Sequence, residues 1–184
     1  MATPIGHALA GVVAGAVAGG RGGLVGRAGG WRELAVFAAL SQVPDLDFIP
    51  GILVGRPSLF HHGISHSLGA AVLFGLVVGA VGWWKGGRKA GLKWGWIAAV
   101  MYGVHVIVDY WTMDPRPPIG LPLWWPVNHE YVLASHPVLL NIKRELSQPG
   151  AILHDLKAVG LEIALLGPPA ALAGLLRARI GRKA

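Results

Sequence analysis

Five runs of apolar residues, separated by polar or proline-containing stretches, dominate the chain. They cover roughly residues 5–20, 31–43, 64–84, 92–110 and 152–176. A bilayer is crossed by about 20 predominantly apolar residues in a helix. The pattern therefore predicts an all-α integral membrane bundle of about five transmembrane helices, with a long outer loop between the fourth and the fifth. The length suits a single membrane-embedded domain, residues 1–184.

Two of the runs carry signs of irregularity. The second is short for a span, and Pro44 directly after it is expected to end the helix. Pro168 and Pro169 are expected to kink the fifth. Gly11, Gly15 and Gly19 are spaced four apart in the first run, an arrangement that lets helices approach closely in lipid.

Composition supports a membrane protein and narrows the chemistry. Hydrophobic residues make up 53% of the chain and charged residues 14%, whereas a soluble domain carries about 25% charged residues. There is no cysteine. Disulfides and thiolate metal sites are thereby excluded, and any metal must be held by His, Asp or Glu.

The net charge of +7 raises the question of nucleic-acid binding, but the placement of the charges argues against it. The basic residues cluster between the first and second runs, between the third and fourth, and in the C-terminal tail. This alternation follows the positive-inside rule. It places the N-terminus outside and the tail in the cytoplasm. The first run lacks a preceding basic segment, so we expect a retained helix and not a signal peptide.

Histidine and aspartate gather at the ends of the apolar runs. His61, His62 and His66 fall within six residues, in the stretch FHHGISHSL. The others are His7 in the first run, Asp45 and Asp47 after the second, and His105 and Asp109 near the end of the fourth. In a five-span topology all eight lie at the outer ends of the helices. Ionisable groups gathered at one depth of a membrane predict a functional site facing the periplasm.

A divalent metal is the ligand that this set of side chains favours. Histidine plus carboxylate without sulfur fits zinc, manganese or iron(II). His105 and Asp109 stand four apart and share a helical face, and Asp45 could bridge two ions about 3.5–4 Å apart. Because a catalytic zinc usually takes three protein ligands, some of the eight must orient ligands or carry protons. His7 is a candidate ligand or a satisfied packing residue.

Three residues are candidates for catalytic acid or base. They are Asp47, for which a turn or cap after Pro44 is the alternative, His62, and Glu162, which lies inside the fifth run. Glu162 is a candidate ligand or proton carrier, with a buried hydrogen-bonded group as the alternative.

The motifs, taken in order, resemble those of the YdjM-like family of bacterial inner-membrane metal-dependent hydrolases. They are TxxxHA from Thr3, PDxD from Pro44, HxGxSHSL from His61 and HxxxD from His105. His62 departs from the family pattern, since it stands where an arginine is usual. The resemblance runs from Thr3 to about Glu162 and implies metal binding by His7, Asp45, His61, His66, His105 and Asp109.

The loop 114–150 contains six prolines between Pro115 and Pro137 and is long enough to be a lid or a binding surface. Arg116, Lys143 and Arg144 lie in it and are candidates for binding a phosphate headgroup, with solvated surface residues as the alternative.

These observations predict a hydrolase with two divalent ions, most simply zinc. We expect a metal-activated water to attack a phosphoester or acyl bond of a lipid or lipid-linked substrate at the outer interface. Two other classes fit the same residues. A metal or proton-coupled transporter would need polar residues to continue across the bilayer, and a scaffold or binding protein would hold a structural metal in a closed shell.

Overall fold

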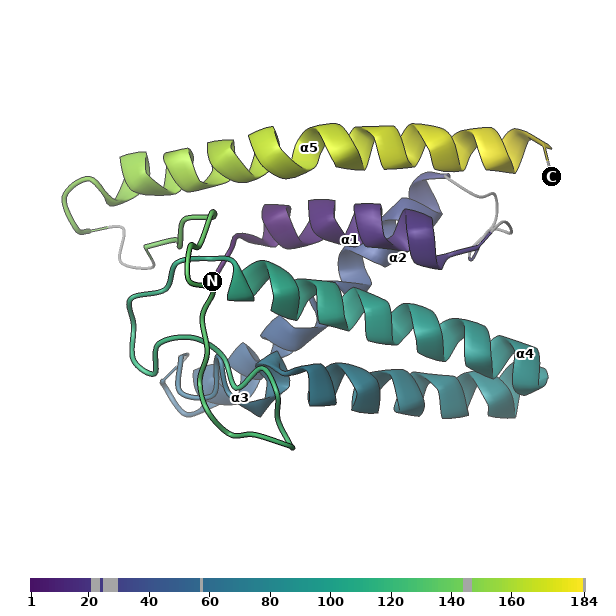
Figure 1. Cartoon of the computed structure of the whole chain (residues 1–184), viewed down its shortest axis with the longest axis horizontal. Helices are drawn as coiled ribbons and strands as arrows, with labels where there is room; N and C mark the ends of the chain where they lie inside the picture. Colours follow the sequence, from purple (N-terminus) through teal and green to yellow (C-terminus); the bar gives the residue numbers. More distant parts are fainter. Residues whose placement is uncertain (21–23, 25–29, 57, 144–146, 184) are drawn as a thin grey trace.

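The computed structural model of the chain describes residues 1–20, 24, 30–56, 58–143 and 147–183. Its α-helices are α1 (Pro4–Ala18), α2 (Trp31–Leu40), α3 (Phe48–Leu53), α4 (Leu68–Tyr110) and α5 (Ala151–Lys183), drawn in Figure 1. Two 3-10 turns, η1 (Val43–Asp47) and η2 (Ile64–His66), precede α3 and α4. The described residues form no β-strand, only two isolated bridges within the long loop. The predicted all-α fold class is confirmed.

α4 is a helical hairpin that contains both the third and the fourth apolar runs. Gly87, with φ 75°, reverses the chain, so that two arms of α4 run antiparallel (Figure 1). This left-handed φ favours glycine. The arms meet through glycines: a Cβ on Gly95 would lie 2.8 Å from the carbonyl oxygen of Gly75 and 3.0 Å from the Cα of Gly79.

Gly95→Ala is therefore expected to destabilise the protein, by about 1–3 kcal/mol, because the added methyl group forces the arms apart. Gly160→Ala in α5 is the matched control, since a Cβ there meets no atom within 4 Å. An alanine at that position should leave stability unchanged or raise it by roughly 0.5–1 kcal/mol. Thermal unfolding in detergent measures both variants, and equal melting temperatures would contradict close packing of the arms.

The helices differ in how far they can cross a membrane. α4 and α5 are long and apolar enough to cross, and α2 with the segment Val43–Leu53 passes the same test as a pair bent by 47°. α1 has 15 residues, about 22 Å, and is shorter than a bilayer core of about 30 Å. α2 ends at Leu40, four residues before Pro44, and Pro44 stands at the start of η1, from which the chain continues into α3.

The start of α4 also differs from the sequence-based expectation. α4 begins at Leu68 and not near residue 64, because the Ser67 hydroxyl caps it by accepting from the backbone nitrogen of Ala70 at 3.0 Å. α5 continues as one helix through Pro168 and Pro169, and the kink expected there stays a prediction.

α1 is the central helix of the bundle and packs against α5, α4 and α2. The expected close approach at its glycines is present on the side facing α2. A Cβ on Gly11 would lie 2.6 Å from the Ser41 hydroxyl, and one on Gly15 would overlap the ring of Phe37. This packing fixes the position of His7, which is fully buried one turn into α1.

α5 carries two buried charges that match the two ends of α1. Glu162 accepts hydrogen bonds from the backbone nitrogens of Thr3 (2.7 Å) and Gly6 (3.1 Å) and from the Thr3 hydroxyl. At the other end, Arg177 donates to the carbonyls of Gly19 and Gly20. A negative charge at a helix N-terminus and a positive one at its C-terminus both stabilise the helix dipole. The two helices run parallel, and the 15-residue separation of the charges equals the length of α1.

The same arginine belongs to the basic C-terminal tail, yet its side chain is buried. Arg177 is 1% exposed and forms a two-pronged pair with Glu33 of α2, with nitrogen–oxygen distances of 3.1 and 3.0 Å. It therefore fastens α5, α2 and the C-terminus of α1 together.

Candidate metal centre

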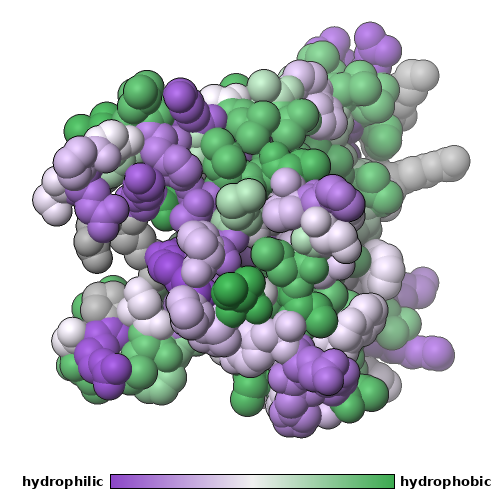
Figure 2. Space-filling view, turned by 60° about the vertical axis from the view of Figure 1, so that its left-hand side comes forward, coloured by the Kyte–Doolittle hydropathy of each residue, from purple (hydrophilic) through white to green (hydrophobic). Residues whose placement is uncertain are grey.

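All eight expected His and Asp side chains lie together at one end of the bundle. His7 comes from α1, Asp45 and Asp47 from η1, the three histidines of FHHGISH from the segment before α4, and His105 and Asp109 from the last turns of α4. The long loop covers the same end (Figure 1), where hydrophilic residues border a recess in the surface (Figure 2). The side chains of His7, His66, His105 and Asp109 are fully buried.

The core of the centre is a triangle of three ligand-type atoms. His105 Nε2 lies 3.2 Å from His66 Nε2 and 3.3 Å from Asp109 Oδ2, and the third side measures 3.5 Å. Zinc bonds of about 2.0–2.2 Å place neighbouring ligands of a tetrahedral ion about 3.3–3.6 Å apart. The sides of the triangle thus fit one face of a coordination tetrahedron.

The outer nitrogen of each central histidine is held by a hydrogen bond. His105 Nδ1 donates to the carbonyl oxygen of Ser41 at 2.7 Å, and this carbonyl is free to accept because α2 ends there. His66 Nδ1 lies 3.1 Å from Asp47 Oδ2. Such contacts fix the ring orientation and leave Nε2 as the ligand atom, as in many metal sites.

Asp47 has a positioning role in this arrangement. Besides His66 it contacts His61 Nδ1 at 3.0 Å, and it accepts a hydrogen bond from the Ser65 hydroxyl at 2.6 Å. Tyr102 of α4 donates to the Ser65 carbonyl at 2.8 Å and anchors the same segment. Asp47 therefore orients two histidines from behind.

Six buried polar atoms of the centre have no hydrogen-bond partner among the described residues. They are both ring nitrogens of His7, Asp45 Oδ1, His61 Nε2, His62 Nε2 and Asp109 Oδ2. Buried polar groups are normally satisfied, and this many in one place calls for a missing partner. Carboxylate oxygens and neutral imidazole nitrogens both coordinate divalent cations. The residues therefore fit the metal that the sequence predicts.

Asp45 lies between two sets of histidines. Its Oδ1 is 3.6 Å from both His66 Nε2 and His105 Nε2, and 3.7 Å from His61 Nδ1. His7, stacked on His105 with ring centroids 3.7 Å apart, forms a further ligand group with Asp45 and His105. Several three-residue groups that could hold a metal ion therefore share these members.

The electrostatics of the histidine segment favour a positive charge at the centre. Burial disfavours the charged form of His66, but its contacts with Asp45 and Asp47 and the charge of Asp109 outweigh it and raise its pKa to about 9. Burial lowers the pKa of His61 to about 4 although Asp47 opposes the shift, so this ring is neutral and has a lone pair to offer.

His62 adopts a backbone conformation that is rare for a non-glycine residue. Its φ is 62°, a left-handed conformation that costs energy and that clusters at functional sites. The ring contacts two carboxylates: Nε2 lies 3.7 Å from Asp109 Oδ2 and Nδ1 lies 3.6 Å from Asp114 Oδ2. Burial lowers the pKa of His62. The residue in place of the family's arginine therefore contacts both the ligand set and the loop.

The remaining sequence candidates lie outside the ligand groups. Glu162 is bound to the N-terminus of α1, as described above. Arg116 makes a two-pronged pair with Asp114, both contacts measuring 2.9 Å, and reaches the centre only through that carboxylate. The backbone nitrogen of Lys143 donates to Asp155 of α5. Arg144 lies outside the described residues.

Sequence reasoning did not single out Arg56. It lines a cavity of about 490 Å³ together with His61, Ser58, Leu59, Pro117 and Pro118. Among the described residues Arg56 has no carboxylate partner. Asp45, whose side chain is 16% exposed, is the most open of the ligand candidates, and it contacts His61 on this cavity. A lone arginine in a short linker carries no pattern that could have placed it beside the centre.

The fold and the centre define an integral membrane protein with a buried His/Asp site of the metal-binding type. A family model described as YdjM inner membrane protein matches residues 1–166, so the chain belongs to this family of inner membrane proteins. The expected family and membrane are thereby confirmed. Neither the curated proteins nor the solved structures gave a match.

Proposed function

We propose that the protein is a membrane-bound metal-dependent hydrolase acting on a phosphoester or acyl bond of a lipid or lipid-linked substrate. The convergence of His66 Nε2, His105 Nε2 and Asp109 Oδ2, with Asp45 Oδ1 beside them, carries this proposal. One or two divalent ions held there would act as Lewis acids and lower the pKa of a bound water to near neutrality.

The chain's own residues would prepare the site for this chemistry. Asp47 and the Ser41 carbonyl fix the orientation of His61, His66 and His105. His62 stands between Asp109 and Asp114, within reach to hold or pass a proton. The buried positions of His7 and Asp109 exclude bulk water, so substrate reaches the centre from the more open side formed by Asp45 and His61.

The proposed substrate carries an anionic group, because the cavity next to His61 contains Arg56. A guanidinium binds a phosphate through two parallel hydrogen bonds, whereas a neutral acyl ester would leave it without a partner. This favours a phosphoester over an acyl ester. The basic hairpin tip of α4 and the tail lie at the end opposite the centre, so by the positive-inside rule the site would face the periplasm, at the depth of lipid headgroups.

Arg56→Gln is expected to raise the KM for a phosphate-bearing substrate roughly tenfold or more, because a hydrogen bond to a charged group contributes about 1.5–3 kcal/mol. Bound metal and kcat should stay close to wild type, since the arginine lies outside the ligand set. Arg32→Gln, an exposed arginine of α2, is the matched control. An unchanged KM in Arg56→Gln would remove this residue from substrate binding.

The hydrolase proposal is tested with protein purified in detergent and a panel of phosphomonoesters, phosphodiesters and acyl esters. We expect hydrolysis to be lost when a chelator is added and in His66→Ala. Zinc or manganese should restore it to the chelated wild type. Activity that persists under both treatments would contradict the proposal.

A further inference from the structure

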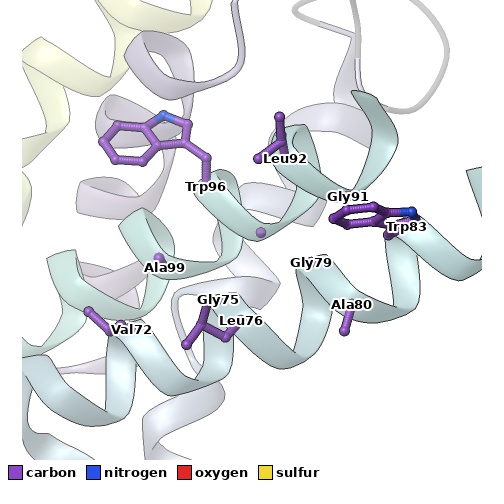
Figure 3. Close-up of a pocket in the computed structure, with 11 residues that line it drawn as sticks. Val72, Gly75, Leu76, Gly79, Ala80, Trp83, Gly91, Leu92, Trp96 and Ala99 are labelled. Carbon is purple, nitrogen blue, oxygen red and sulfur yellow. The ribbon is translucent and has the colours of Figure 1, made fainter. Parts of the chain in front are cut away.

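The α4 hairpin carries an apolar groove between its arms, away from the metal centre. The groove has a volume of about 560 Å³ and extends from the middle of the hairpin toward the tip at Gly87. Trp83 of the first arm and Trp96 of the second stand at its borders, with Leu76 and Leu92 between them (Figure 3). These four side chains are exposed, so the groove opens to the membrane.

A second recess lies between the arms closer to the tip. It measures about 330 Å³ and is made of other residues, among them Lys85 and Trp94. Here an apolar wall and a cationic side chain belong to one recess. Lys85 therefore places a cation beside an apolar surface near the tip.

The tip itself is strongly basic. Lys85, Arg88, Lys89 and Lys93 lie within nine residues, and the sequence contains no acidic residue between Asp47 and Asp109. Lys85, Arg88 and Lys89 are exposed. The hairpin offers no carboxylate of its own to the exposed Lys85, Arg88 and Lys89, so an anion that binds them comes from outside the hairpin.

We propose that the hairpin binds an anionic phospholipid, with an acyl chain in the apolar groove and the headgroup phosphate on the basic tip. An occupant has to be apolar along the groove and negatively charged at its end, and an anionic phospholipid is both. Basic residues at the end of a membrane helix are a known means of binding acidic headgroups. A second copy of the chain fits less well, because a symmetric pair would bring two basic tips together.

This lipid is distinct from the proposed substrate. Gly87 lies at one end of the hairpin, whereas Leu68 and Tyr110, next to the metal centre, lie at the other. The site does not depend on the proposed hydrolase activity, and it can be tested in a protein that hydrolyses nothing.

Native mass spectrometry of the full chain in detergent tests the charge of the ligand. The probes are phosphatidylglycerol and phosphatidylcholine with identical acyl chains. We expect phosphatidylglycerol to bind more tightly, and Lys85→Gln with Lys89→Gln to weaken it roughly tenfold to thirtyfold, from about a fivefold contribution of each cation near an anionic surface. Arg179→Gln with Arg182→Gln in α5 removes the same charge from exposed residues and should have little effect.

A second pair of variants tests the groove. Ala80→Phe fills it and should weaken phosphatidylglycerol binding, whereas Val77→Phe places the same aromatic side chain at an exposed position that lines neither recess. Equal binding of the two lipids, or equal effects of the paired variants, would overturn the proposal. So would a dimer that Ala80→Phe dissociates, because the groove would then hold a second copy.

Discussion

Asp109→Asn is expected to lower the affinity for divalent metal by more than a hundredfold and, with it, to abolish the proposed hydrolysis. Asp109 lies within 3.7 Å of four histidines, more than any other carboxylate of the centre contacts. They are His7, His62, His66 and His105. An amide of the same shape removes the negative charge and offers a weaker ligand. Competition with a fluorescent chelator measures the affinity, and hydrolysis is assayed on the same sample.

Two carboxylates provide the comparison for this variant. Asp47→Asn should reduce metal affinity only about 10–100-fold, because Asp47 acts through the histidines that it orients. Asp155→Asn changes a carboxylate that accepts a hydrogen bond from the Lys143 backbone, outside the centre, and should bind metal like wild type. Equal affinities in Asp109→Asn and Asp155→Asn would show that Asp109 is not a ligand.

Arg177→Met is expected to cost about 3–5 kcal/mol of stability, the largest effect of any substitution away from the metal centre. The variant leaves the Glu33 carboxylate buried without its countercharge, and removing one partner of a buried ion pair typically costs this much. The two carbonyls at the end of α1 also lose their donor. Chemical or thermal unfolding in detergent, followed by circular dichroism, gives the change.

The double variant Arg177→Met, Glu33→Leu separates charge burial from packing. It should recover part of the loss, because both charges are then absent and an apolar pair of similar volume takes their place. Arg179→Met, two residues along α5 and exposed, is the control and should be neutral. Similar melting temperatures for Arg177→Met and Arg179→Met would contradict the account of this ion pair.

The convergence of the histidines and aspartates could be predicted because they mark the ends of apolar runs. Once the runs are arranged as antiparallel helices, His7, Asp45 and Asp109 must lie at one end. The hydrogen bonds that orient these histidines leave no comparable pattern in the sequence. The group that orients His105 is a backbone carbonyl, and any residue at position 41 would provide one.

The partners of Arg177 and Glu162 could not be predicted from the sequence, for a different reason. Arg177 belongs to a basic tail whose pattern indicates a cytoplasmic surface, and nothing in that pattern distinguishes it from exposed Arg179. Glu162 lies 159 residues from Thr3, and its partners are mainly backbone nitrogens. The polar stretch between the third and fourth runs suggested a loop, yet lysine and arginine favour helices, and only Gly87 breaks α4.

Elemental mass spectrometry of detergent-purified protein tests most directly whether the buried His/Asp centre holds metal. Wild type supplied with zinc and manganese during purification should retain about two equivalents, and His66→Ala should lose them while remaining folded. A folded wild-type protein that retains no divalent metal after this treatment would contradict the account.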